Sequence, residues 1–233
     1  PTVGIGCGSD AAKIDRGVSA SGVRCVVYGD PAQLFEDLVS GKIDAAVRGD
    51  MSSSKLLPLL KKALGLKELE RSVLLQPAGG KLFFMTPVGV DEGWTIDEKY
   101  DLVTKTIVLM KDMGMDARVA VISGGRKEDR GRHVSVDASL EEAKELAGRL
   151  VSAGYRAYDA EILLERAAME ANLIVVPDGV VGNLLFRALH FLGGAAAIGA
   201  PVVNADVVFV DTSRVKEDYS DSIKLAARLA GGK

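Results

Sequence analysis

Short apolar runs alternate with longer segments of helical periodicity along most of the chain. Short apolar runs bounded by turn residues predict strands, and longer amphipathic segments predict helices. The predicted strands are Thr2–Gly6, Arg24–Tyr28, Ile43–Val47, Ser72–Gln76, Leu82–Thr86, Ala117–Ile122, Tyr155–Asp159, Leu173–Val176 and Asp206–Val210. The predicted helices are Pro31–Ser40, Ser53–Leu64, Asp97–Met113, Ser139–Ala153, Glu161–Glu170, Val180–Leu192 and Glu217–Ala230. Because strand–helix–strand connections are crossovers, this order predicts an α/β fold with largely parallel sheets flanked by helices.

The helix predicted from Ser139 has the clearest end signals. Ser139 is a suitable N-cap, Glu142 completes a capping box with it, and Gly154 follows the last helical residue. We therefore predict that this helix begins at Ser139 and ends before Gly154.

Two interruptions of the pattern suggest a division into two lobes. The first is the polar stretch Pro87–Glu98, and the second is Ala200–Ala205, which contains Pro201 and Asn204. We expect residues 1–88 and 205–233 to form a first α/β lobe with both termini. Residues 89–204 would form a second α/β lobe, with a ligand cleft between the two.

Composition narrows the class of protein. The 233 residues suffice for one large domain or two coupled lobes, and a net charge of -3 gives no basic surface for nucleic acid. The apolar runs are too short to span a membrane, and the chain opens without a signal-peptide pattern. Cys7 and Cys25, its two cysteines, have neither CxxC spacing nor a nearby histidine. We therefore expect a cytoplasmic protein without a disulfide framework or a metal site.

Polar clusters follow several predicted strands, at the strand ends where parallel α/β sheets bind ligands. Ser52, Ser53 and Ser54 follow the strand Ile43–Val47, and their hydroxyls either cap the next helix or bind phosphate with its free amides. The glycine-rich segment Gly4–Asp10 follows the first strand and is either a tight turn or a ligand loop. It does not meet the GxGxxG spacing.

A charged loop, residues 123–132, follows the strand Ala117–Ile122. It is either a solvated loop or an anion-binding one, and Ser123, Gly125 and Arg126 are its candidate ligand residues. We favour the solvated loop for most of its other side chains, because Glu128 and Asp129 offset half of its positive charge.

Two more clusters contain candidate ligand residues. Asp178 either caps the helix that follows it or contacts a ligand, and Asn183 can present its side-chain amide to a ligand. Ser213 and Arg214 follow the last predicted strand and suit a carbonyl or phosphate oxygen. The histidines, His133 and His190, are not expected to be catalytic, because no Ser–His–Asp order or metal-ligand cluster accompanies them.

Several of these segments together resemble one known family. Residues 172–183 (NLIVVPDGVVGN) and 191–201 (FLGGAAAIGAP) closely resemble the phosphate acetyl/butyryltransferase family. Residues 43–60, 118–125 and 211–214 (DTSR) are similar to further segments of that family, in the same order. The compact MtxX branch, methyltransferase-related methanogenesis marker proteins of methanogenic archaea, is similar in the VGIG start and the GDMSS segment.

The resemblance implies a fold and a site. The family has two α/β lobes, as isocitrate dehydrogenases do, with an acyl-CoA and phosphate cleft between them, and its members are commonly dimers. It implies that Ser213 and Arg214 stabilise substrate and that Asp218 or Asp221 accepts the proton of the CoA thiol. Val215 and Lys216 depart from the family, which has Gly and a small residue there.

The combined expectation is a transferase that binds an anionic or acyl small molecule, with CoA or a phosphate-bearing compound as ligand. The expected partners are a second copy of the chain and a methyltransferase protein, with no nucleic acid and no membrane. The alternative is a non-catalytic accessory or ligand-sensing protein of a methyltransferase system. A nicotinamide-dependent decarboxylating dehydrogenase is disfavoured because the chain lacks that group's metal-binding aspartates.

Overall fold

The computed structural model describes residues 1–232. The strands are β1 (Thr2–Gly6), β2 (Arg24–Tyr28), β3 (Ala45–Val47), β4 (Val73–Gln76), β5 (Phe83–Thr86), β6 (Val119–Ile122), β7 (Ala157–Glu161), β8 (Leu173–Val175), β9 (Ala196–Pro201) and β10 (Val208–Asp211). The helices are α1 (Ala11–Ser21), α2 (Pro31–Val39), α3 (Ser53–Leu64), α4 (Ile96–Asp112), α5 (Val134–Ser152), α6 (Leu164–Glu170), α7 (Gly179–Arg187) and α8 (Ser220–Gly231). A 3-10 turn, η1 (Lys127–Asp129), precedes α5, and a π-helical turn, η2 (Ala188–Leu192), extends α7.

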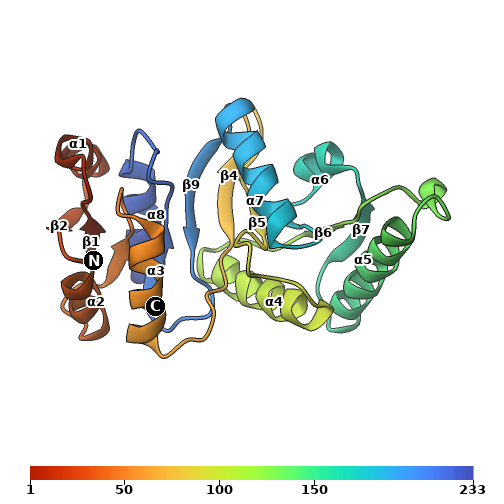
Figure 1. Ribbon diagram of the computed structural model, residues 1–233, viewed down its shortest axis with the longest axis horizontal. Helices are drawn as coiled ribbons and strands as arrows, with labels where there is room; N and C mark the ends of the chain where they lie inside the picture. Colours follow the sequence, from red (N-terminus) through yellow and green to blue (C-terminus); the bar gives the residue numbers. More distant parts are fainter. Residues whose placement is uncertain (233) are drawn as a thin grey trace. The chain divides into compact units, whose positions relative to one another are not determined.

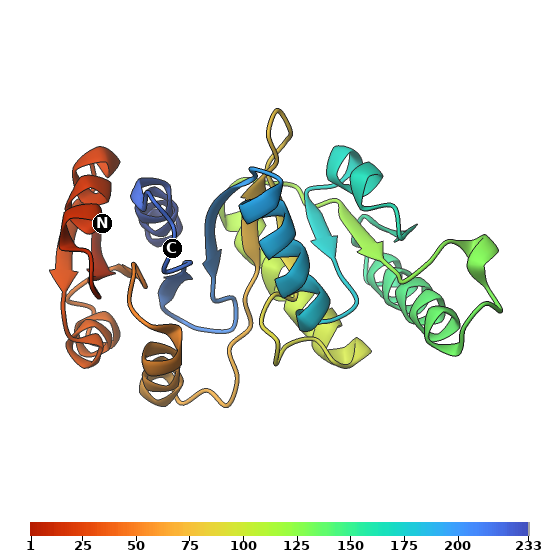
Figure 2. The same cartoon turned by 45° about the horizontal axis from the view of Figure 1, so that its top comes forward.

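The chain forms two compact units. The first unit comprises Pro1–Leu69 and Ile198–Lys233. Its strands follow the order β2-β1-β3-β10-β9, all parallel except β9, which runs antiparallel to β10. Helices α2 and α3 lie on one face of this sheet and α1 and α8 on the other (Figure 1, Figure 2).

The second unit is Glu70–Ala197. Its strand order is β4-β5-β8-β6-β7, parallel except for the antiparallel pair β4–β5. Helices α4 and α5 cover one face, and α6 and α7 the other (Figure 2). The predicted α/β class with largely parallel sheets flanked by helices is thus confirmed. None of the helices between residues 1 and 232 combines the length and apolar character needed to cross a bilayer.

The units divide at 69/70 and 197/198, whereas the sequence pattern placed the boundaries at 88/89 and 204/205. Strand pairing accounts for the difference. β4 pairs with β5, and β5 pairs with β8, so residues 70–86 belong to the sheet of the second unit.

The start of α5 corrects one prediction. The helix begins at Val134, where the ring nitrogen Nδ1 of His133 accepts a hydrogen bond from the amide of Ser135 at 3.1 Å. Ser139 therefore lies inside the helix, and its hydroxyl accepts a hydrogen bond from the amide of Gly124 at 2.8 Å instead of capping. The predicted end is confirmed, because Gly154 follows it with a φ of 88°.

Two elements were not predicted, α1 and β9. Strand β9 contains Gly199 and Pro201, which weaken a sequence-based strand signal. Glycine is required there, because a Cβ on Gly199 would lie 2.5 Å from a methyl carbon of Val210. Tertiary packing therefore overrides the local preference at this position.

The core beneath α2 and α3 fixes which strand residues face these helices. Ala46 of β3 and Phe209 of β10 are fully buried in one cluster with Leu56 and Leu60 of α3. Phe35 of α2 meets Phe209 edge to face, with ring centroids 5.9 Å apart. Each large side chain buried in this way contributes roughly 1.5–3 kcal/mol by leaving water. Because side chains alternate along a strand, every second residue of β3 and β10 points toward this helical layer.

Candidate functional site

Two predicted clusters follow neighbouring strands at the carboxyl edge of the first unit's sheet. Strands β3 and β10 are parallel neighbours, with Val47 paired to Val210, so the loops that follow them start side by side. The Thr212 hydroxyl donates to the carbonyl oxygen of Gly49 at 2.9 Å and joins the two loops. This brings the Ser52–Ser54 segment and the Ser213–Arg214 pair to the same edge of one sheet.

The N-terminus of α3 is open. Ser52 is its N-cap residue but makes no side-chain hydrogen bond to the first turn. The Ser52 and Ser54 hydroxyl oxygens lie 2.9 Å apart and bond to each other, and Ser53 and Ser54 are exposed. First-turn amides have no partner inside a helix, and the helix dipole makes this end attractive to anions. The serines therefore leave the α3 terminus available to an oxyanion.

The N-terminus of α1, in contrast, is occupied by the protein itself. The Asp50 carboxylate accepts hydrogen bonds from the amides of Gly8 at 2.5 Å, Ser9 at 2.9 Å and Asp10 at 2.9 Å. Burial alone would raise the pKa of Asp50, but these amide hydrogen bonds outweigh it and lower the pKa. In the Gly4–Asp10 segment, the first three residues end β1, and the loop that follows therefore wraps an internal anion.

Gly49 allows this arrangement of the two loops. Its φ is 64°, and a Cβ at this position would lie 1.9 Å from the carbonyl oxygen of Gly6. A side chain here would push the Asp50 loop away from the Gly8 loop.

The Ser213–Arg214 pair lies on a closed turn. The Lys216 amide donates to the carbonyl oxygen of Ser213 at 3.1 Å. The hydroxyl of buried Tyr219 donates to the carbonyl oxygens of Ser213 at 3.0 Å and of Arg214 at 3.2 Å. Both carbonyls are thereby held against the protein, while the side chain of Arg214 is exposed. The turn can present a cation and a hydroxyl to a ligand.

The two carboxylates predicted as bases differ in their surroundings. The Asp218 oxygens accept hydrogen bonds from the Ser220 amide at 2.8 Å and the Ser220 hydroxyl at 2.7 Å. Burial opposes ionisation of Asp218, but the Ser220 hydrogen bonds prevail and its pKa is lowered. Asp221 is exposed in the first turn of α8 and lies 3.4 Å from the Lys224 ammonium. Both residues are exposed, but the Asp218 carboxylate is held by Ser220 at the start of α8, whereas the Asp221 carboxylate pairs with exposed Lys224.

Lys216 is a site residue that sequence reasoning did not single out. Its ammonium donates to the carbonyl oxygen of Ile198 at 3.0 Å and to the Ser222 hydroxyl at 2.8 Å. Burial lowers its pKa to about 8, although the charges of Asp221 and Asp218 act in the opposite direction. The only sequence signal was that a lysine stands where the resembling family has a small residue.

The second unit contains the remaining predicted residues. Ser123 is buried and its hydroxyl donates to the carbonyl oxygen of Gly125 at 2.9 Å, whereas Arg126 is exposed. The other cations of the loop form ion pairs on its surface, namely Lys127 with Glu161, Arg130 with Glu141 and Arg132 with Asp129. These pairs favour a solvated loop, with Arg126 as its candidate cation for a ligand.

Asp178 and Asn183 support the backbone around α7. The Asp178 carboxylate accepts from the Val181 amide at 2.8 Å and caps the helix. The Asn183 side-chain amide donates to the carbonyl oxygen of Val88 at 3.1 Å, and the Gly179 amide donates to the carbonyl oxygen of Glu92 at 3.0 Å. These contacts fix α7 on the 88–92 loop, and the cap makes the start of α7 less attractive to an anion than the start of α3.

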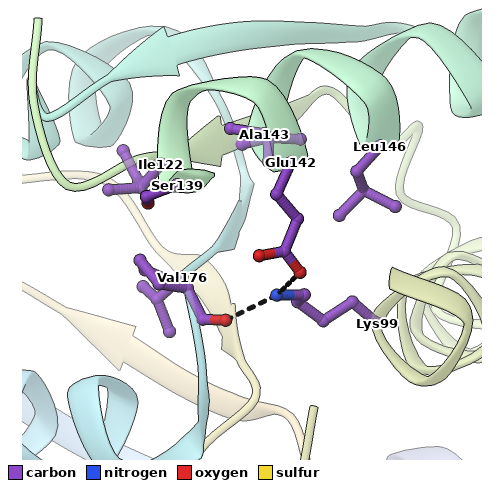
Figure 3. A pocket seen from close by; sticks show the side chains of 9 residues that line it. Lys99, Ile122, Ser139, Glu142, Ala143, Leu146 and Val176 are labelled. Atoms are coloured by element: carbon purple, nitrogen blue, oxygen red, sulfur yellow. Dashed lines mark hydrogen bonds and ion pairs between the residues drawn. The ribbon is translucent and has the colours of Figure 1, made fainter. Parts of the chain in front are cut away.

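A small pocket in the second unit also was not predicted. Lys99, which is 4 % exposed, donates to the carbonyl oxygen of Pro177 at 2.6 Å and pairs with Glu142 (Figure 3). The pocket lies between α4, α5 and the ends of β6 and β8, with room for about one water molecule. A sequence signal existed, because Lys99 falls on the buried face of α4 with Leu102 and Val103. Within residues 1–232 no group of three or more His, Cys, Asp or Glu side chains could hold a metal ion.

Sequence comparison identifies similar proteins in archaea and bacteria. The chain is 43 % identical to a Methanosarcina mazei protein named "Putative methyltransferase mtx subunit X", over 211 residues that cover 90 % of this chain and 75 % of that protein. It is 24 % identical to a phosphate acetyltransferase from Corynebacterium glutamicum, over 96 % of this chain and 70 % of that enzyme. No protein-family model matches the chain.

Structural comparison agrees on the fold. A branched-chain phosphotransacylase from Enterococcus faecalis superposes with a TM-score of 0.73 over 98 % of both chains, at 18 % sequence identity. The sequence interpretation of an α/β fold of the phosphate acetyltransferase type is confirmed.

Proposed function

Since this chain belongs to the family of the mtx subunit X proteins, a family distantly related to phosphate acetyltransferases, we propose that it is a transferase-like protein acting on an anionic or acyl small molecule. The observation that carries the proposal is the pairing of the Ser213–Arg214 turn with the open α3 terminus at one sheet edge. CoA or a phosphate-bearing compound is the ligand class that such an edge suits.

The chemistry proposed is acyl transfer between a phosphate oxygen and a thiol. Arg214 would stabilise charge that develops on the acyl or phosphoryl oxygens, and Ser213 would donate a hydrogen bond to the carbonyl oxygen. Asp221 would accept the thiol proton, because Asp218 is held by Ser220. The unperturbed pKa of a thiol is about 8.5. A nearby cation therefore needs to lower this pKa only modestly for the thiolate to form.

The test is a thioester-formation assay with acetyl phosphate and CoA. The variant is Arg214→Ala, and Arg16→Ala, an exposed arginine on α1 of the same unit, is the matched control. We expect Arg214→Ala to reduce turnover about 10-fold to 1000-fold and Arg16→Ala to leave it unchanged. Wild-type turnover in Arg214→Ala would remove its catalytic role.

The second candidate is a non-catalytic accessory or ligand-sensing protein. The commitment of Asp218 to the α8 terminus favours it, because that leaves one predicted base without a proton-accepting role. The accessory protein would bind acetyl phosphate or CoA without producing thioester, and calorimetry in parallel with the assay separates the two candidates.

The relatives named as a subunit suggest an assembly for this chain as well. We expect a homodimer and a methyltransferase protein as a further partner. Light scattering at several chain concentrations tests the first expectation: a mass of one chain throughout would contradict it. Co-purification with methyltransferase subunits tests the second.

A further inference from the structure

Arg48 is an unusual buried cation at the end of β3. The residue is 7 % exposed, and its Nε atom lies 2.8 Å from a carboxylate oxygen of Asp211. The contact lacks hydrogen-bond geometry, so Nε is buried without a hydrogen-bond partner. Within residues 1–232 no side-chain hydrogen bond from Arg48 is formed, although a guanidinium carries five N–H donors. Leaving the buried Nε donor without a hydrogen bond is costly, and a ligand that accepts hydrogen bonds from the guanidinium reduces that cost.

The strand pattern shows which way Arg48 points. Ala46 and Phe209 face the layer that contains α3, as members of one core cluster. Arg48 and Asp211 stand two residues further along the same strands, so alternation places them on that same face. This alternation directs Arg48 toward the layer that contains α3, whose first residue is Ser53.

Two independent features therefore converge at one place. One is a nearly buried guanidinium with unused donors, and the other is the N-terminus of α3 without a side-chain cap. We propose that Arg48 anchors a phosphoryl group at the start of α3, together with the first-turn amides and the hydroxyls of Ser52–Ser54. This inference rests on the proposed function and deepens it, because it names the group that the site holds and a residue that holds it.

A phosphoryl group fits better than a carboxylate. A guanidinium binds two oxygens side by side in its planar fork, and amides and hydroxyls at the helix start offer donors from a different direction. A tetrahedral phosphate has enough oxygens for both sets, whereas the two oxygens of a carboxylate satisfy only one. Asp211 balances the charge of Arg48 when the site is empty.

The direct test is titration calorimetry of inorganic phosphate at fixed ionic strength. Arg48→Lys keeps the charge and loses the fork, and Arg16→Lys on the surface of α1 is the matched control. We expect Arg48→Lys to bind phosphate at least 10-fold more weakly than the wild type and the control. Acetate is expected to bind more weakly than phosphate to the wild type.

A second variant keeps the proposal testable even if Arg48→Lys does not fold. Ser53 is the first helical residue, where proline is well tolerated, and the extended backbone of Ser52, at φ -65° and ψ 121°, suits a following proline. Ser53→Pro removes one amide donor from the α3 terminus and should weaken phosphate binding several-fold.

Failure of this inference differs from failure of the proposed function. Unchanged phosphate affinity in both Arg48→Lys and Ser53→Pro overturns the Arg48 site. A wild type that does not bind phosphate also overturns it, even if thioester turnover depends on Arg214. Weakened phosphate binding in both variants without any thioester formation supports the site and removes the transferase.

Discussion

The ammonium nitrogen of Lys216 lies 2.8 Å from the hydroxyl oxygen of Ser222, which donates in turn to the carbonyl oxygen of Ile198. This contact holds the turn that carries Ser213 and Arg214 to α8 and β9. It depends on pH, because burial lowers the pKa of Lys216 from 10.5 to about 8.

The contribution of Lys216 to the free energy of unfolding should therefore increase with pH between about 8 and 10.5. In this window the unfolded chain binds a proton that the folded chain does not, so the free energy of unfolding increases with pH. We expect the gain in unfolding free energy from pH 7 to pH 9.5 to be larger in the wild type than in Lys216→Met. Urea denaturation at the two pH values measures it, with Lys224→Met as the exposed control. Equal gains in all three proteins would contradict the lowered pKa.

The Asp50 carboxylate should be essential to the first unit. Asp50→Ala removes the charged acceptor of the amides of Gly8, Ser9 and Asp10, and a hydrogen bond to a charged group contributes about 1.5–3 kcal/mol. We expect a loss of at least 2 kcal/mol by urea denaturation, against little change for Asp15→Ala on the exposed surface of α1.

Acid should remove the stabilisation that the charged Asp50 carboxylate provides. The pKa of Asp50 is lowered, so its stabilisation is present above the pKa of the unfolded carboxyl and is lost as pH falls through the folded value. The wild type should lose more unfolding free energy between pH 6 and pH 3 than Asp50→Asn. A larger loss in the variant would show that the amide cluster does not favour the charged form.

The effects of substituting Lys99 and Glu142 on the free energy of unfolding should depend strongly on each other. Lys99→Met leaves Glu142 without its cation, and breaking a buried ion pair from one side costs about 3 kcal/mol, less here because Glu142 is partly exposed. The double variant Lys99→Met/Glu142→Leu should be more stable than the sum of the single changes predicts. A double-mutant cycle measures this coupling, and additivity within about 0.5 kcal/mol would refute it.

Replacing two helical glycines with alanine should change the stability of the protein in opposite directions. A Cβ on Gly179 would lie 1.6 Å from the carbonyl oxygen of Gly89, so Gly179→Ala should separate α7 from that loop and destabilise the protein. A Cβ on Gly148 in α5 would meet nothing within 4 Å, so Gly148→Ala should stabilise by about 0.5–1 kcal/mol. Thermal unfolding of both variants checks the prediction, and a stabilising Gly179→Ala would contradict it.

Elements with local signals could be predicted from the sequence. The predicted bounds of α3 agree with the structure, because serine precedes it and Gly65 ends it with a left-handed backbone. The start of α5 could not be predicted for two reasons. A histidine cap is uncommon, and Ser139 and Glu142 have the spacing of a capping box although both lie inside the helix. The hydroxyl of Ser139 instead meets Gly124, a contact that no local pattern encodes.

The candidate site was predictable only in its outline. The rule that ligands bind at strand ends located Ser52–Ser54 and Ser213–Arg214, which follow neighbouring strands of one sheet. The role of Asp50 depends on amides about forty positions earlier in the chain, and the pairing of Arg48 depends on Asp211 from the last strand. Such long-range contacts arise from strand order, which composition and periodicity do not specify.

The position of β10 between β3 and β9 has a consequence for biosynthesis. Residues 1–69 are made before the second unit, but their sheet lacks β10, and α1 lacks α8 beside it, until residues 208–231 are made. The second unit is continuous in sequence, so its strands β4 to β8 are all available sooner. We therefore expect residues 1–69, although made before the second unit, to acquire their native structure after it. In nascent chains from which residues 70–197 have left the ribosome but residues 208–231 have not, the second unit should resist proteolysis and the first should not.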